Sequence, residues 1–446
     1  MTKQKRKYER PSIKAMEASM PSKAGCGGSV SHVREIDGVS IEAMVGKYGS
    51  PLFVFSEKKI RENIKCAKTA FQSRYPSVTF AWSYKTNYLS RICKVFHEEG
   101  SWAEVVSGYE YQRAIDNGVD PSRIIFNGPS KTDDDLTTAV NNDSIIHIDN
   151  LLELNRLCEI VARIGKKARV GIRVNLEVDV YPRWSRFGFN LENGEAMAAV
   201  EKVLRSEKIM LEGIHCHIGT FVLSLDAYRL ATKKMAEFAS IIEEKFSTEI
   251  RYIDMGGGFA SKNTLKGTYG AGEDLTPSFD DYAVVITNAL LGTKFRNNHH
   301  PMLVLETGRA LIDDAGFLAT SVIAHKHLPD GTSNTIIDAG VNLLFTSFWY
   351  NHKISPVSCT TQRLEATKLT GPLCMNIDVV RERVVLPLAG RGDILMIHNV
   401  GAYNVSQWMQ FIEYRPSVAF VKTDGSVSVI RNRETMEAMT NLEIIE

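Results

Sequence analysis

Short apolar stretches alternate with longer, mixed stretches over most of the first 310 residues. The short stretches are rich in β-branched and aromatic residues and predict eight strands, at residues 78–85, 102–107, 123–127, 144–149, 168–175, 211–218, 250–258 and 302–309. The stretches between them have helical spacing, and the one that begins at Leu151 ends at Gly165, a residue typical of a helix C-terminus. Eight strands alternating with helices are typical of one α/β fold, the (β/α)8 barrel. The competing architecture is an open, doubly wound sheet, which would place a G-x-G-x-x-G turn after an early strand, where this sequence has none.

The pattern changes near residue 310. Beyond it the apolar segments are short and β-branched with little helical spacing, which predicts a mostly antiparallel β domain over residues 311–446. We expect the barrel to span residues 53–310. The segment 32–52 is expected to join the β domain, which would then be built from both ends of the chain. Residues 1–31 are basic and then rich in glycine and serine, which predicts a flexible lead-in.

Composition narrows the class of protein. A chain of 446 residues is long enough for two domains. A net charge of +1 favours neither nucleic acid nor an anionic membrane as partner, and we expect no membrane span. The seven cysteines are scattered without a C-x-x-C pair, which argues against a disulfide framework or zinc knuckle and predicts a reducing, cytoplasmic setting.

Candidate chemistry lies at the C-terminal ends of the predicted strands, where barrel enzymes place their active sites. Strand one ends in Lys85. In a barrel mouth, desolvation would lower the pKa of this amine and make it nucleophilic. The alternative without a function is a lysine that reaches solvent. Strand seven ends in the glycines 256–258, whose backbone N–H groups suit a phosphate but could also serve only a tight turn. Strand eight ends in Glu306 and Arg309, which could instead form a structural ion pair.

Two histidines on strand six raise the question of a metal. Alternation along a strand places His215 and His217 on one face, as metal ligands require. No third ligand has convincing spacing, so we predict no metal site. An amine that condenses with an aldehyde, an anion cradle, a carboxylate and a histidine around one barrel mouth are instead the requirements of pyridoxal 5'-phosphate (PLP).

Motifs along the chain resemble, in order and spacing, those of the fold-type III PLP-dependent decarboxylases, which include diaminopimelate and ornithine decarboxylases. The resemblance covers about residues 45 to 420, and its motifs are SYKTN, WAEVVSGYEY, FNGPSK, GIHCHIGT, MGGGF, ETGR, GPLCMNID and GAYN. WAEVVSGYEY is similar to the family's D-V-V-S-G-G-E-L, with Glu104 where the family usually has Asp.

The resemblance implies PLP as cofactor and a role for each matching residue. Lys85 would bind PLP as a Schiff base, His217 would stack on its ring and Glu306 would pair with its pyridine nitrogen. Cys374 would be the catalytic thiol, in a loop that enters the partner's barrel, so the family implies a homodimer with shared active sites. The remaining residues expected around the cofactor are Glu104, Thr220, Gly256, Gly257, Gly258, Gly308, Arg309 and Tyr403.

Two departures from the family concern the substrate, an amino acid. Met375 follows the cysteine where relatives have Glu or Asp, and Thr346 stands where an arginine holds the distal carboxylate. We expect Arg309, Thr346, Tyr350 and Met375 to face the substrate. A buried charge needs an opposite charge nearby. We therefore expect the distal end of the substrate to be uncharged, to extend beyond these positions, or to be bound by other residues.

We therefore predict α-decarboxylation of an amino acid or amino-acid conjugate, such as a citrate conjugate of siderophore assembly or a carrier-bound amino acid. The alternatives are a diaminopimelate or other basic amino-acid decarboxylase proper, a racemase, and a non-catalytic regulator of the same fold. Retention of Lys85, Glu306 and Cys374 argues against a regulator.

Overall fold

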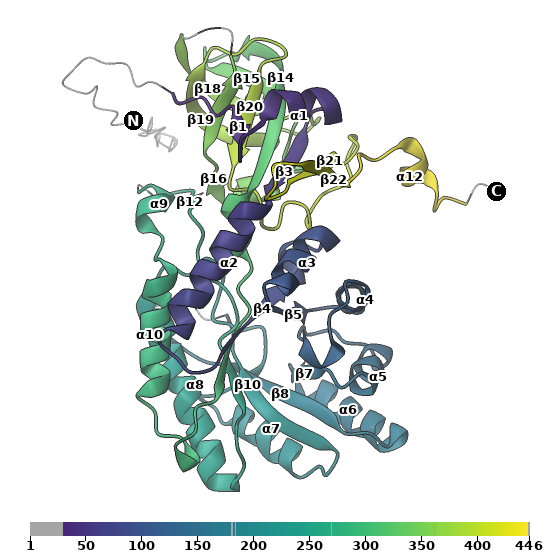
Figure 1. The fold of residues 1–446 in the computed structure, drawn as a ribbon, viewed down its shortest axis with the longest axis vertical. Helices are drawn as coiled ribbons and strands as arrows, with labels where there is room; N and C mark the ends of the chain where they lie inside the picture. The colour runs from purple at the N-terminus through teal and green to yellow at the C-terminus, as the bar shows by residue number, and fades with distance from the viewer. Residues whose placement is uncertain are drawn as a thin grey trace, which may run out of the picture.

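A computed structural model describes residues 30–179, 182, 184–268, 270–359, 361 and 363–444. The lead-in expected over residues 1–31 lies outside the described residues except for its last two. A barrel of strands and helices lies below a β domain in the view of Figure 1. None of the described helices is both long and apolar enough to cross a membrane.

Eight parallel strands close into the barrel, because β10 pairs with both β8 and β11 and because β13 pairs with β4. All eight predicted strands and the fold class are therefore confirmed. The barrel strands are β4 (Val78–Ser83), β5 (Trp102–Val105), β6 (Ile124–Phe126), β7 (Ile145–Ile148), β8 (Ala168–Asn175), β10 (Ile209–His215), β11 (Tyr252–Asp254) and β13 (Met302–Leu305).

Several strands end earlier than their apolar pattern predicts. Strand β4 stops at Ser83, and Lys85 lies in the 3-10 turn η1 (Tyr84–Thr86). Strand β11 stops at Asp254, since Gly256 and Gly258 take positive φ angles of 65° and 98° that no strand permits. The residues beyond each strand end thus leave the ladder and form loops at one rim of the barrel.

Helices cover the outside of the barrel, and the caps at their ends explain their bounds. Helix α6 is capped at its N-terminus by Asn150, whose side chain accepts the backbone N–H of Glu153, and at its C-terminus by Gly165 in the left-handed conformation, as predicted. Figure 1 shows α8 and α10 side by side on one flank. The barrel helices are α2 (Glu57–Gln72), α3 (Ser90–Glu98), α4 (Gly108–Asp116), α5 (Asp133–Asn141), α6 (Leu151–Ile164), α7 (Glu195–Leu204), α8 (Leu225–Phe246) and α10 (Phe279–Leu291).

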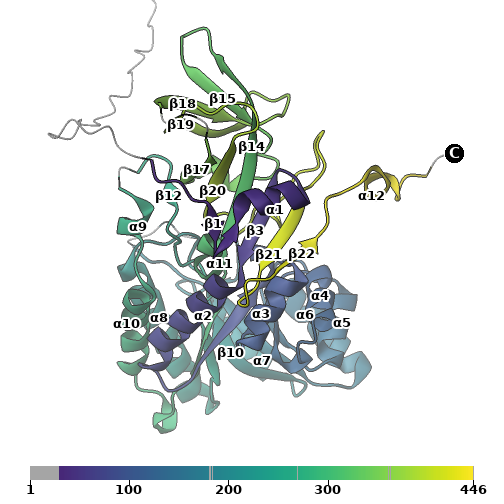
Figure 2. The ribbon, with the colours of Figure 1, turned by 45° about the horizontal axis from the view of Figure 1, so that its top comes forward.

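The β domain uses a strand from the N-terminal part of the chain. Strand β3 (Leu52–Ser56) precedes the barrel, yet it pairs with β14 on one side and β21 on the other. All five of its residues are buried, which a central strand requires, and Figure 2 shows α2 leading from it down into the barrel. The other strands are β14 (Gly316–His327), β15 (Ser333–Ile337), β17 (Ile354–Ser358), β18 (Leu364–Thr370), β19 (Val379–Pro387), β20 (Ile394–His398), β21 (Ser417–Val421) and β22 (Val427–Arg431), and most pairings are antiparallel.

A loop of the β domain closes onto the first barrel turn. The backbone N–H of Tyr403 donates to the carbonyl of Thr86 at 2.9 Å, and the hydroxyl of Ser406 donates to the carbonyl of Lys85 at 2.8 Å. These contacts join residues more than 300 positions apart in the chain. The GAYN segment is thereby fixed beside Lys85.

Candidate active site

A pocket of about 500 Å³ opens at the C-terminal rim of the barrel. Most of the residues that the motifs single out contribute to its wall, although they come from η1, from the segments that follow β10, β11 and β13, and from the β domain. These residues are Lys85, His217, Thr220, Gly257, Gly258, Glu306, Gly308, Arg309, Tyr350 and Tyr403. The pocket therefore brings together the lysine, the glycines and the carboxylate that the sequence placed at separate strand ends.

Lys85 points its amine at the carboxylate of Glu104 on β5. Lys85 Nζ donates to Glu104 Oε1 at 2.7 Å and to Oε2 at 2.6 Å, and Ser83 Oγ donates to Oε2 at 2.6 Å. Burial opposes the ammonium form, but the carboxylates of Glu104 and Glu306 outweigh it and raise the pKa of Lys85. The expected lowering of this pKa by desolvation is therefore wrong for the cofactor-free chain, because Glu104 holds the amine as an ammonium.

Asn127 links the two carboxylates of the site. Its Nδ2 donates to Glu104 Oε1 at 3.2 Å and also to Glu306 Oε1. Its Oδ1 lies 2.8 Å from Nδ1 of His147, whose Nε2 lies 2.9 Å from the Tyr252 hydroxyl. All of these side chains are buried. Sequence reasoning assigned no role to Asn127, although it lies in the FNGPSK motif, and did not find His147, which lies in the apolar strand β7.

Small residues make room for this buried polar chain. A Cβ atom on Gly171 of β8 would lie 2.6 Å from the His147 ring and 2.9 Å from its Nε2. A substituent there would have to displace the ring. The glycine therefore explains how a histidine and a tyrosine fit inside the barrel below the pocket.

His215 belongs to a second buried group below the pocket. Its Nε2 lies 3.3 Å from Glu306 Oε2, and its ring stacks on His147 at 4.7 Å between centroids. Burial and the neighbouring carboxylate of Glu306 raise the pKa of Asp254 well above its usual range, so Asp254 holds its proton more tightly than an exposed aspartate does. Burial lowers the pKa of both histidines, which stay neutral.

This buried group contains residues of the types that bind metals, which the spacing of residues in the sequence had not placed beside His215. Donor atoms of His147, His215, Asp254 and Glu306 all lie within 4.8 Å of one another. Three of the four are engaged inside the protein: His147 with Asn127 and Tyr252, Asp254 with the backbone N–H of Gly256, and Glu306 with Asn127. Hydrogen bonding thus accounts for most of the group without an ion. His217 is not part of it.

His217 sits instead against the glycine loop. Its Nδ1 accepts the backbone N–H of Gly257 at 3.1 Å. Burial, with Arg173 and Lys85 nearby, lowers the pKa of His217 to about 3, so its ring is neutral. A Cβ atom on Gly257 would lie 2.5 Å from the carbonyl oxygen of Glu306, so this loop tolerates no side chain there. The result is a neutral, flat imidazole next to a bare backbone segment.

Arg309 is surrounded by aromatic rings. Its guanidinium carbon lies 4.5 Å from the Tyr403 ring centre, 5.3 Å from that of Tyr350 and 5.9 Å from that of Phe221. Its buried Nη1 has no hydrogen-bond partner among the described residues. A buried cationic donor without an acceptor suits an anionic ligand.

Three predicted site residues lie elsewhere. Thr346 is buried in η5 (Phe345–Phe348), donates its hydroxyl to Asn404 Oδ1 at 2.9 Å, and is not part of the pocket wall. Cys374 is exposed, in a loop held by Asp378, and neither it nor the half-buried Met375 lines the pocket of its own chain. The structure therefore separates the thiol from Lys85 within one chain.

Aromatic residues that sequence reasoning missed form the rest of the wall. Trp184 meets the His217 ring edge-on at 6.0 Å between centroids, and Phe221, Trp349 and Leu265 complete the apolar side. Trp184 and Phe221 lie in loops with no periodic pattern, so no sequence signal marks them. Trp349 precedes Tyr350 directly and could have been found from it.

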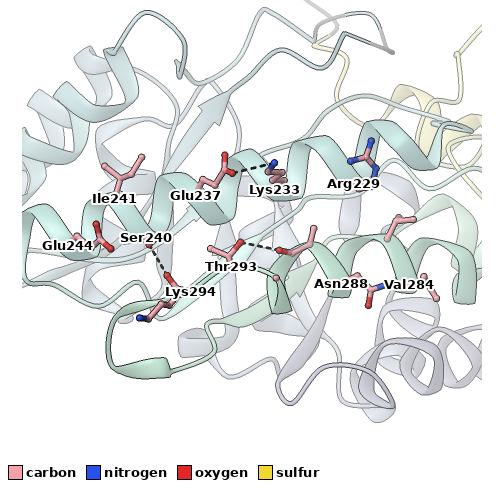
Figure 3. A pocket seen from close by; sticks show the side chains of 13 residues that line it. Arg229, Lys233, Glu237, Ser240, Ile241, Glu244, Val284, Asn288, Thr293 and Lys294 are labelled. Carbon is pink, nitrogen blue, oxygen red and sulfur yellow. Dashed lines mark hydrogen bonds and ion pairs between the residues drawn. The ribbon is translucent and has the colours of Figure 1, made fainter.

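A larger hollow, of about 820 Å³, lies between α8 and α10 on the outside of the barrel (Figure 3). Its polar groups satisfy one another: Lys233 lies 3.8 Å from Glu237, and Ser240 donates to the carbonyl of Lys294 at 2.9 Å. It lies on the outer helices α8 and α10 (Figure 3), away from the strand ends where Lys85 and the glycine loop lie. The smaller pocket is therefore the candidate active site.

The residues of the pocket fit PLP. The amine of Lys85, the free Nη1 of Arg309, the glycine loop and the Glu306 carboxylate match the aldehyde, the phosphate and the pyridine nitrogen in chemistry. Fold and site together define a class of barrel enzymes that hold a phosphorylated cofactor on a lysine.

Comparison with known proteins agrees. Residues 57–313 match the family "pyridoxal-dependent decarboxylase, pyridoxal binding domain". Two relatives named diaminopimelate decarboxylase are 32% identical (Aquifex aeolicus; 90% of this chain, 93% of the relative) and 30% identical (Methanocaldococcus jannaschii; 92% and 94%). A crystal structure of the M. jannaschii enzyme superimposes with a TM-score of 0.86 at 29% identity, over 94% of this chain and 98% of that one. A complex of that enzyme with L-lysine has the same TM-score.

The chain belongs to the pyridoxal-dependent decarboxylase family. It is a PLP-dependent carboxy-lyase that acts on amino acids, which confirms the cofactor and the reaction class expected from the motifs.

Proposed function

We propose that this enzyme decarboxylates an amino acid whose distal end is uncharged or extended, such as a side-chain conjugate or a carrier-bound amino acid. The observation that carries the proposal is the composition of the pocket wall. Among the described residues, its charged groups are Lys85, Glu306 and Arg309. The rest of the wall includes the apolar residues Trp184, Phe221, Leu265 and Trp349 and the uncharged polar residues Ser83 and Gln407, none of which can form an ion pair with a distal charge.

The chain's residues divide the work around the cofactor, which supplies an electron sink when bound. Lys85 is the attachment point; before it reacts it must lose a proton, for which Glu104 is the nearest acceptor. Glu306 would hold a proton at the pyridine nitrogen of the cofactor, and Asn127 orients its carboxylate by donating to Oε1. His217, whose Nδ1 accepts the backbone N–H of Gly257, would pack on the cofactor ring. The residues that would hold the phosphate are Gly256–Gly258, Thr220, Gly308, Arg309 and Tyr403.

The thiol that returns a proton to the substrate carbon is proposed to come from a second copy of the chain. Cys374 is exposed and lies outside the pocket of its own chain. Its neighbour Ile377 is 53% exposed, and Trp349, at the pocket wall, is 47% exposed. Exposed apolar groups of this kind favour burial against another chain. A homodimer would cover both and complete the site, with Met375 beside the substrate.

A substrate screen tests the proposal. Carbon dioxide release is measured for free meso-diaminopimelate, lysine and ornithine and for side-chain acylated or carrier-linked amino acids, with Lys85→Ala as a blank. Because a missing partner for a buried charge costs about 2–5 kcal/mol, kcat/KM for the free amino acids should lie at least about a hundredfold below that of the best conjugate. The names of the relatives favour diaminopimelate itself, and fast turnover of that compound would overturn the proposal. Inversion of an amino acid without carbon dioxide release would instead show a racemase.

A further inference from the structure

Two histidines and a glutamate meet on one face of the β domain, at the far end of β14. His325 and His327 are two positions apart on this strand, so alternation places both imidazoles on the same side. Their ring centroids are 5.4 Å apart. Glu365 of β18 reaches the same place, with Oε1 at 3.8 Å from Nε2 of His327. Sheet order places β15 between these two strands, so the three side chains bridge it.

The donor atoms are close enough to share one ion. One donor atom from each of the three residues lies within 4.8 Å of the other two. In a tetrahedral zinc site, bonds of about 2.0–2.1 Å put neighbouring donors about 3.4 Å apart. The His327 side chain is 64% exposed, so it is free to rotate and bring its donor atom to the shorter spacing that zinc requires.

The surroundings of the three side chains also suit a cation. Register places Ser333 of β15 opposite His327, and its buried Oγ has no hydrogen-bond partner among the described residues. The neighbouring lysines, Lys326 and Lys368, align with Asn334 in the register and so point to the other face. Lys368 is occupied there by Glu382 at 3.0 Å.

We propose that His325, His327 and Glu365 form a binding site for a borderline divalent cation of the zinc type. Two imidazole nitrogens and one carboxylate oxygen are ligands that zinc prefers, and three protein ligands leave a position for water. The bound ion would tie β14 to β18 across β15 and so stabilise this sheet. The site is separate from the pocket at Lys85 and does not depend on the substrate of the enzyme.

Calorimetric titration of zinc into metal-free, PLP-loaded protein tests the site. We expect one site per chain that is lost in the double variant His325→Ala/His327→Ala and weakened at least about tenfold, or about 1.4 kcal/mol, in Glu365→Gln. His300→Ala is the matched control, since it removes an exposed imidazole elsewhere, and should bind zinc like the parent. Zinc should also raise the Tm of the parent but not that of the double variant.

Two results would overturn the proposal. One is the absence of zinc binding by the parent. The other is zinc binding by the double variant with the parent's stoichiometry and Kd, which would place the ion elsewhere, for example at the buried group around His215 or at exposed thiols. An anomalous difference map at the zinc edge, with its peak between the three side chains, would support the assignment directly.

Discussion

The side-chain oxygen of Asn127 lies 2.8 Å from Nδ1 of His147, at the centre of the barrel below the pocket. An amide oxygen only accepts hydrogen bonds, so Nδ1 carries the proton and Nε2 must accept from the Tyr252 hydroxyl. The donors therefore run in one direction, from Tyr252 through His147 and Asn127 to Glu306 and Glu104. Such a chain orients both carboxylates.

Asn127→Ala should keep the fold but lower kcat by about 10- to 100-fold, the usual effect of losing a group that orients a functional side chain. Tyr252→Phe removes only the first donor of the chain and should have a smaller effect. Steady-state kinetics and the pH profile of kcat measure both, with the pocket-distant Asn288→Ala as control. A parent-like rate and pH profile in Asn127→Ala would show that Glu306 needs no such support.

Lys85→Ala should abolish decarboxylation and leave the fold intact, as circular dichroism would show, because the side chain lies in the pocket and not in the core. Borohydride reduction of the parent followed by peptide mapping should find the cofactor on Lys85. Lys131 is a built-in control: it is buried and held by Glu153 at 2.6 Å, so it should carry no label. Label on any lysine other than Lys85 contradicts the assignment.

Glu306→Gln should still bind PLP but lose about 10²–10³ in rate, since an amide cannot hold a proton at the pyridine nitrogen. The absorbance of the bound cofactor reports binding, and single-turnover carbon dioxide release reports the rate. If the rate stays within a few-fold of the parent, Glu306 has only a structural role.

Mixing Lys85→Ala with Cys374→Ala subunits should restore activity. Random exchange makes half of the dimers mixed, each with one intact site of two, so recovery reaches at most about a quarter of the parent activity. Subunit exchange is verified by native mass spectrometry of tagged chains. Exchange without recovery excludes a site shared between subunits.

Glu110 should make stability depend on pH. Burial, with the nearby carboxylate of Glu104, raises the pKa of Glu110 to about 7 in the folded, cofactor-free chain, above the ordinary value of 4.5. A raised acid pKa means that the folded state binds the proton more tightly, so stability from this group is complete below about pH 4.5 and is lost as pH rises toward 7.

Glu110→Gln removes that dependence while its amide oxygen can still accept the backbone N–H of Val106. The variant should therefore gain stability relative to the parent between pH 5 and pH 8, by about 1–3 kcal/mol. Urea unfolding of the cofactor-free proteins at both pH values measures the difference. A difference that is constant with pH would show that Glu110 titrates near its ordinary value.

The sequence by itself determined the barrel and the β domain, and the resemblance of its motifs to a known family determined the reaction class. Local patterns carry this information: eight apolar segments predict eight strands, and Lys85, the glycines and Glu306 stand at strand ends, which a barrel gathers at one rim. The glycines could be recognised in the sequence as part of the site because their loop has no room for side chains, as the close approach of Gly257 to Glu306 shows.

Only the tertiary structure decided the properties that depend on contacts between distant segments. The pKa of Lys85 is raised rather than lowered because Glu104, on the next strand, lies 2.6 Å away. Thr346 matches a substrate position in sequence, yet it is turned away by Asn404, 58 residues further along the chain. Trp184 enters the pocket from an irregular loop. These outcomes depend on which side chains meet across the barrel rim. The periodicity of a single segment contains no information about such contacts between distant segments.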